Sequence, residues 1–211
     1  MSLLLDRGAD INMVGGEYGT ALAAAALQFN TTILLLLLNR GANINAIGGK
    51  YGTALAAAAS AQRTGTVATL LDWGADVKIM GGEYGTALAA AAYTGWDSVV
   101  ELLIDRGADI NAVAGEYGTA LTAAAFARRT ETVLLLLGWG AGINIVGGTY
   151  GTALAAAAFR GLDSMVTLLL DRGADINMVG GEFGTALVAA AFKGFTRTAS
   201  LLLDRDRKSV V

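Results

Sequence analysis

The sequence contains no histidine, no cysteine and no proline. Without histidine and cysteine, it lacks the commonest general base, the commonest zinc ligands and the thiol nucleophile. No disulfide framework can form, which fits a cytoplasmic, or possibly nuclear, location. Without proline, the 29 glycines must supply nearly all the turns. The composition therefore favours a non-enzymatic protein, and we expect no metal and no cofactor.

Aromatic residues are scarce, at 7%, although 54% of the residues are hydrophobic. Alanine and leucine carry this hydrophobicity, and both favour helix. The net charge of -3 gives no strong electrostatic field, so nucleic acid is not an expected partner. Leucine-rich runs such as 33–38 are far shorter than the roughly 20 residues of a membrane span. Residues 1–7 lack the pattern of a secretory signal.

One pattern repeats along the chain at a fixed step of 33 residues. The tetrapeptide Gly-Thr-Ala-Leu begins at six glycines, and a second series of six glycines keeps the same step. The repeat predicts one domain over residues 1–211, with a partial unit at 1–16 and a shortened last unit. We number the units 1 to 6, at 17–49, 50–82, 83–115, 116–148, 149–181 and 182–211. The tetrapeptide glycines are Gly19, Gly52, Gly85, Gly118, Gly151 and Gly184, and the second series is Gly8, Gly41, Gly74, Gly107, Gly140 and Gly173.

Each unit is predicted to contain two helices followed by a glycine-rich loop. The threonine of Gly-Thr-Ala-Leu is suited to cap the first helix. We expect a glycine of the second series in a left-handed conformation after the second helix. Helices of about ten residues are marginal in isolation, so stability must come from stacking of the units. The candidate caps of the second helices are Thr31, Thr64, Asp97, Thr130, Asp163 and Thr196.

Residues 83–115 carry the pattern most completely, with Gly-Thr-Ala-Leu at 85–88 and Gly-Ala-Asp-Ile-Asn at 107–111. This unit resembles the ankyrin repeat. The resemblance implies an all-α solenoid of helix-turn-helix units, with glycine-rich loops or short β-hairpins. It further implies a protein-binding scaffold or recognition module that acts through the concave face. The glycine pair before Glu-Tyr-Gly-Thr-Ala-Leu is similar to fungal arrays, including those of NACHT-type signalling proteins, in which the array is a recognition or regulatory module.

The chain departs from the family where Thr-Pro-Leu-His becomes Thr-Ala-Leu-Ala. The family's histidine ties adjacent loops together, so we expect weaker hydrogen bonding between units here. The series Tyr18, Tyr51, Tyr84, Tyr117, Tyr150 and Phe183 is uniform, which predicts aromatic stacking between units.

Residues that vary between units are better candidates for partner contacts. The two positions just before the second helix vary most, and tryptophan and arginine are enriched at interaction hot spots. Two further cations share one repeat position on neighbouring units, so the basic residues could form a stripe; the alternative is an ordinary solvated face. The predicted partner-binding residues are Trp96, Arg128, Arg129, Arg160 and Lys193.

Head-to-tail self-assembly into filaments or other homo-oligomers is the alternative function. A solenoid presents an apolar face at each end unless a polar terminal unit covers it. The candidate self-association residues are Leu3, Leu4 and Leu5 at the start and Leu201, Leu202 and Leu203 in the last unit. The competing explanation is that the chain is a fragment whose ends are covered by further sequence. An enzyme with an unrecognised carboxylate site is a weak third possibility.

Overall fold

The computed structural model describes residues 8–28 and 30–209, which form twelve helices and no strand. Leu3, Leu4 and Leu5 lie outside the described residues. The first helices of the units are α2 (Ala21–Leu27), α4 (Ala54–Ser60), α6 (Ala87–Thr94), α8 (Ala120–Phe126), α10 (Ala153–Phe159) and α12 (Ala186–Phe192). The second helices are α3 (Thr31–Asn39), α5 (Thr64–Asp72), α7 (Asp97–Asp105), α9 (Thr130–Gly138), α11 (Asp163–Asp171) and α13 (Thr196–Ser209).

The first helices begin as the sequence predicts. In each of them the threonine of Gly-Thr-Ala-Leu is the N-cap; Thr86 Oγ1, for example, accepts the Ala89 N–H at 3.0 Å. The expected caps of the second helices are wrong, because those residues are already the first helical ones and the preceding residue takes the capping position. Asp97 instead accepts a hydrogen bond at 2.6 Å from Thr132 in the next unit.

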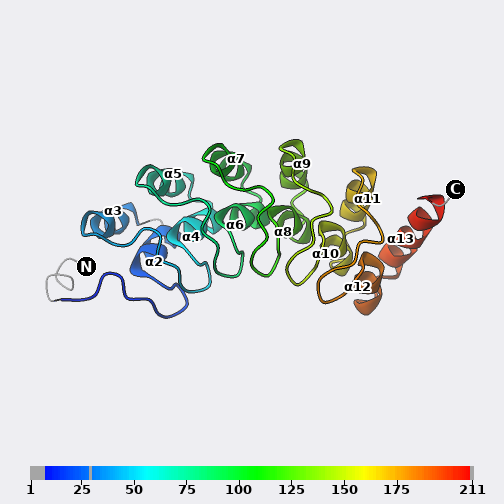
Figure 1. Ribbon diagram of the computed structural model, residues 1–211, viewed down its shortest axis with the longest axis horizontal. Coiled ribbons are helices and arrows are strands. Elements are labelled where there is room, and N and C mark those ends of the chain that lie inside the picture. Colours follow the sequence, from blue (N-terminus) through cyan, green and yellow to red (C-terminus); the bar gives the residue numbers. More distant parts are fainter. Residues whose placement is uncertain (1–7, 29, 210–211) are drawn as a thin grey trace.

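The units stack into a curved solenoid with two rows of helices (Figure 1). The first helices form the inner row and the second helices form the outer row, with the loops projecting from the inner side. Neighbouring first helices pack along their lengths, whereas neighbouring second helices touch at fewer points. Alanines such as Ala90 and Ala91 are fully buried and let the inner helices approach closely. The inner row is therefore the more tightly packed one, and the stack bends around it.

The last helix, α13, has 14 residues and exceeds the expected length of about ten. Earlier second helices end before a glycine with positive φ, such as Gly107 at +87°. Asp206 occupies that position in the last unit, so no left-handed glycine stops the helix. No helix within the described ranges is long and apolar enough to cross a membrane.

Two series of hydrogen bonds connect the loops of neighbouring units. In the backbone series the Glu83 N–H donates to the Lys50 carbonyl at 2.7 Å, and each later unit repeats this bond. In the second series an asparagine Oδ1 accepts an N–H of the next loop, as Asn45 does from Asp76 at 2.9 Å. Neighbouring loops are thus hydrogen-bonded to one another although the chain has no histidine. The asparagines that accept them are Asn12, Asn45, Asn111 and Asn144.

Aromatic rings form a continuous series from Tyr51 to Phe183, which confirms the predicted stacking for units 2 to 6, whereas Tyr18 is 41% exposed. The rings of Tyr84 and Tyr117 stack at 6.0 Å, as do those of Tyr117 and Tyr150. A second set of rings, at the ends of the first helices, lies between the rings of the first set. The ring centres of Phe126 and Tyr150, for example, are 4.5 Å apart. The rings of this second set belong to Tyr93, Phe126, Phe159 and Phe192.

Candidate binding surface

The five predicted partner-binding residues lie in or beside the turns between the first and second helices of units 3 to 6. Trp96 is 37% exposed, and its Nε1 donates to Thr64 Oγ1 of the preceding unit at 2.8 Å. Arg129 also reaches back by one unit, where its Nε donates to the Tyr93 carbonyl at 3.0 Å. Its side chain lies over Gly95, where a Cβ would come within 2.6 Å of it. Both side chains are thus held across the junction of two units.

Arg128 has a backbone conformation that is unusual for its residue type. Its φ is +61°, in the left-handed region, and its side chain is exposed. Units 3, 5 and 6 place glycine at this position, as Gly95, Gly161 and Gly194. A non-glycine residue in this region costs roughly 1 kcal/mol. Gln62 of unit 2, at the same repeat position, has nearly the same φ of +60° and is also exposed, so the left-handed conformation belongs to this turn of the repeat.

Arg160 and Lys193 lie against aromatic rings of the inner row. The Arg160 guanidinium carbon is 4.6 Å from the centre of the Phe126 ring, and Lys193 Nζ is 4.6 Å from the centre of the Phe159 ring. Each cation thus covers a ring of the preceding unit and gains a cation–π interaction. These two side chains are exposed but are held in place by their contacts.

An exposed row of apolar side chains at the loop tips was missed in the sequence. These side chains are 40–68% exposed and stand one or two residues before the loop glycines. A Cβ at Gly147 would lie 2.4 Å from Val113 Cγ1, so the glycine makes room for the apolar side chain of the preceding unit. Their 33-residue spacing was the available signal. The row comprises Val14, Ile47, Met80, Val113, Val146 and Val179.

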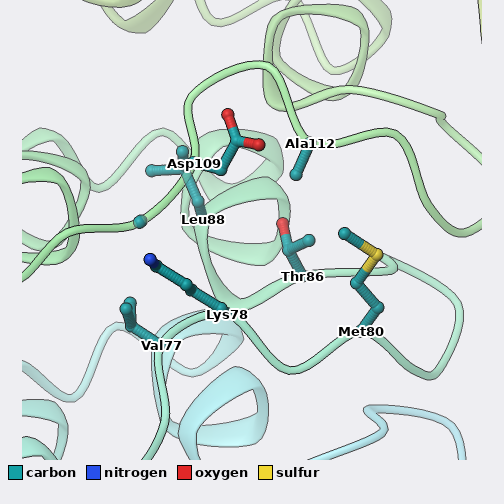
Figure 2. A pocket seen from close by; sticks show the side chains of 8 residues that line it. Val77, Lys78, Met80, Thr86, Leu88, Asp109 and Ala112 are labelled. Atoms are coloured by element: carbon teal, nitrogen blue, oxygen red, sulfur yellow. The ribbon is translucent and has the colours of Figure 1, made fainter.

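A small pocket of about 140 Å³ opens on the loop side between units 2 and 3. Figure 2 shows Lys78, Leu88 and Asp109 on one side of the pocket, with Met80 and Thr86 on the other. Lys78 stands where other units have the bridging asparagine, and no described side chain accepts the Asp109 N–H. The pocket therefore coincides with a break in the bonding between loops.

The pKa values of three of the stacked tyrosines are raised by their burial in the stack. Burial raises the pKa of Tyr84 and of Tyr150 to about 12, and raises the pKa of Tyr117 further. These phenols stay protonated at neutral pH and offer no general base. Among the described residues, no three acidic side chains gather closely enough to hold a metal ion.

Comparison with known proteins gives one consistent result. The family model described as ankyrin repeats in three copies matches residues 1–81 and 80–147, and the single ankyrin-repeat model matches residues 151–180. The crystal structure of the human ASB11 ankyrin repeat domain is similar to this chain at a TM-score of 0.73 and 27% identity. That similarity covers 97% of this chain and 90% of the other.

A search of curated proteins gave no match. In contrast, 559 chains of solved structures match, so the fold is too widespread to specify a function. Ankyrin repeats typically serve as non-enzymatic modules for protein interaction. By its repeat, its two rows of helices and its matched residues, the chain belongs to the ankyrin-repeat family.

Proposed function

We propose that this chain is a protein-binding scaffold whose partner contacts the inner side of the solenoid and the turns of units 3 to 6. The observation that supports this most is the row of exposed side chains held across successive unit junctions, with Trp96 and Arg129 in adjacent units. Tryptophan and arginine are the residues most often found at interaction hot spots. Because their contacts already restrict their conformations, binding would cost little side-chain entropy.

The variety of the repeat supports a narrower version of this proposal. The glycine pair before Glu-Tyr-Gly-Thr-Ala-Leu resembles that of fungal arrays, including those attached to NACHT-type domains. By this analogy, the scaffold would serve as the recognition part of a larger regulatory system.

The proposal is tested by differential capture with the full chain. The wild type is compared with a variant carrying W96A and R129A, and with a control carrying E101A and S164A on exposed positions of the outer helices. We expect a partner that the wild type and the control retain and the first variant loses. Removing a hot-spot tryptophan costs about 2 kcal/mol, or roughly 30-fold in affinity. Equal retention by all three proteins would contradict the proposed surface.

Self-association is a second candidate function, supported by the face that α12 and α13 present. Val188 is 52% exposed and Phe192 is 70% exposed, whereas Ala155, the counterpart of Val188 one unit earlier, is buried. Leu203 is exposed as well. Leu202, which the sequence placed in this interface, is only 1% exposed and belongs to the core. The face thus matches the one that each earlier unit buries against its neighbour, and a second copy could cover it.

A further inference from the structure

The outer row of helices carries a repeated ion pair between units. The last residue of a second helix is usually an aspartate, and an arginine of the next second helix, 34 residues later, reaches back to it. Arg106 Nη1 lies 3.0 Å from Asp72 Oδ1, and Arg205 Nη1 lies 2.7 Å from Asp171 Oδ1. The two pairs have the same sequence separation of 34 residues and join the same two atoms.

Unit 4 breaks this pairing. Gly138 occupies the aspartate position, so Arg172 of unit 5 has no carboxylate within ion-pair distance among the residues that the structure describes. Gly142, four residues later, replaces a second acidic position that is Asp76 in unit 2 and Asp175 in unit 5. Two carboxylates are therefore missing at one turn, beside an exposed guanidinium.

An open groove of about 380 Å³ lies at the same place. It runs along the α9 side of the junction with α11, whose contact is slighter than those of α5 with α7 and of α7 with α9. Nothing comes within 4 Å of the position that a Cβ on Gly138 would take, so the missing side chain leaves open space. The groove therefore has an apolar wall and a cationic end. Its lining consists of Leu134, Leu137, Gly138, Ala141, Ile143 and Arg172.

Unit 2 provides an internal comparison. Units 2 and 4 share the tryptophan that follows this helix end, at Trp73 and Trp139, and they differ at the position of the ion pair, which is Asp72 in unit 2 and Gly138 in unit 4. In unit 2, where the aspartate is present, it forms an ion pair with Arg106 of the next unit. Arg172 therefore lacks the partner that Arg106 has because Gly138 stands at the position of Asp72.

We propose that this groove binds a segment of a protein partner that carries an aspartate or glutamate next to leucine side chains. The partner's carboxylate would take the position that Asp72 and Asp171 hold in their own pairs, and its leucines would lie on Leu134 and Leu137. Charge complementarity supports this occupant, because the planar guanidinium matches a carboxylate with two donors. The site lies on the outer row and does not depend on the surface proposed above.

The chain's own sequence defines the probe. Leu-Leu-Asp, at 70–72 and 169–171, ends in the aspartate that pairs with an arginine of the next unit. A capped peptide containing Leu-Leu-Asp and its Leu-Leu-Asn counterpart would be titrated into the isotope-labelled full chain, with backbone amide shifts as the readout. We expect saturable shifts at Gly138 and Leu137, and affinity for the aspartate peptide about tenfold higher, because a charge-assisted hydrogen bond depends on the carboxylate.

Three variants complete the experiment. R172A removes the cation. G138D introduces the aspartate that units 2 and 5 have at this position, so that it pairs with Arg172. Each variant should weaken the binding of the aspartate peptide about tenfold or more. R106A removes an arginine that is already paired and serves as the matched control, with unchanged binding expected. Equal binding of both peptides, retained binding in R172A and G138D, or no saturable shift at Gly138 would overturn the proposal. None of these outcomes affects the proposal for the Trp96 and Arg129 surface, which is tested separately.

Discussion

Glycines of the two repeated series have the same conformation but different surroundings. Gly118 and Gly107 have φ values of +77° and +87°. A Cβ at Gly118 would lie 2.3 Å from the backbone carbonyl carbon of Gly147, whereas a Cβ at Gly107 would meet nothing within 4 Å. Gly118 is therefore required for both a left-handed backbone and the close approach of two loops, whereas Gly107 is required only for the left-handed backbone.

We predict that Gly118→Ala lowers the free energy of unfolding by about 3 kcal/mol or more, while Gly107→Ala costs only about 1 kcal/mol. The difference arises because an alanine at 118 must push apart two backbone segments that are hydrogen-bonded between units. Urea denaturation followed by circular dichroism measures both values. Equal losses in the two variants would show that the loops separate freely.

Lys78 is a residue at which the repeat can be repaired. It lacks the acceptor oxygen with which Asn45 and Asn111 bind the next loop. Lys78→Asn should raise the free energy of unfolding by about 1 kcal/mol, the usual net value of one such hydrogen bond. The reverse change at an intact junction, Asn144→Lys, should lower it by a similar amount. A shift of the same sign in both variants would mean that the asparagine bonds do not control stability.

At the scale of an element, the buried tyrosines of the aromatic series make the free energy of unfolding decrease at alkaline pH. The pKa of Tyr84 and of Tyr150 is about 12 in the folded chain, against an ordinary value near 10. Folding therefore favours the protonated phenol, and its contribution is complete below pH about 10. Above that pH the unfolded state releases its protons first, so the contribution is lost as the pH approaches 12.

We expect the urea midpoint to be nearly constant from pH 8 to about 9.5 and then to fall steeply. The triple variant Y84F, Y117F and Y150F should keep most of its midpoint at pH 11, because its rings no longer titrate. The control is the exposed Tyr18, whose replacement by phenylalanine should leave the pH profile unchanged. A wild-type profile that matches the triple variant would show that the buried rings do not cause the fall.

At the scale of the whole molecule, we predict that copies associate through the face of α12 and α13. We expect light scattering to give a mass that rises above 21.5 kDa as the protein concentration increases. The double variant V188D and F192D should remain at the monomer mass, because both side chains are exposed and a charge on each opposes burial. A wild type that stays monomeric at millimolar concentration would refute this interface.

Leu202→Asp distinguishes packing from association in the same experiment. Because Leu202 lies in the core, a charge there should unfold the last unit rather than simply separate copies. We expect this variant to lose helical circular dichroism, whereas V188D and F192D keep it.

The sequence alone determined the repeat, the pair of helices in each unit, the threonine caps of the first helices and the stacking of the tyrosines. Each of these depends on residue types within one unit, or on one position occupied alike in successive units. A threonine before an alanine run caps a helix whatever surrounds it, and a ring repeated every 33 residues meets its own copy.

Only the tertiary structure decided which side chains meet between unlike positions. It showed that Arg160 covers Phe126, that Leu202 is buried while Val188 is exposed, and that Arg172 lacks the partner that Arg106 has. These contacts depend on how far the outer helices separate and on which side chain the neighbouring unit places opposite. The repeat period does not predict the distances between outer helices, because these arise from the curvature of the whole stack.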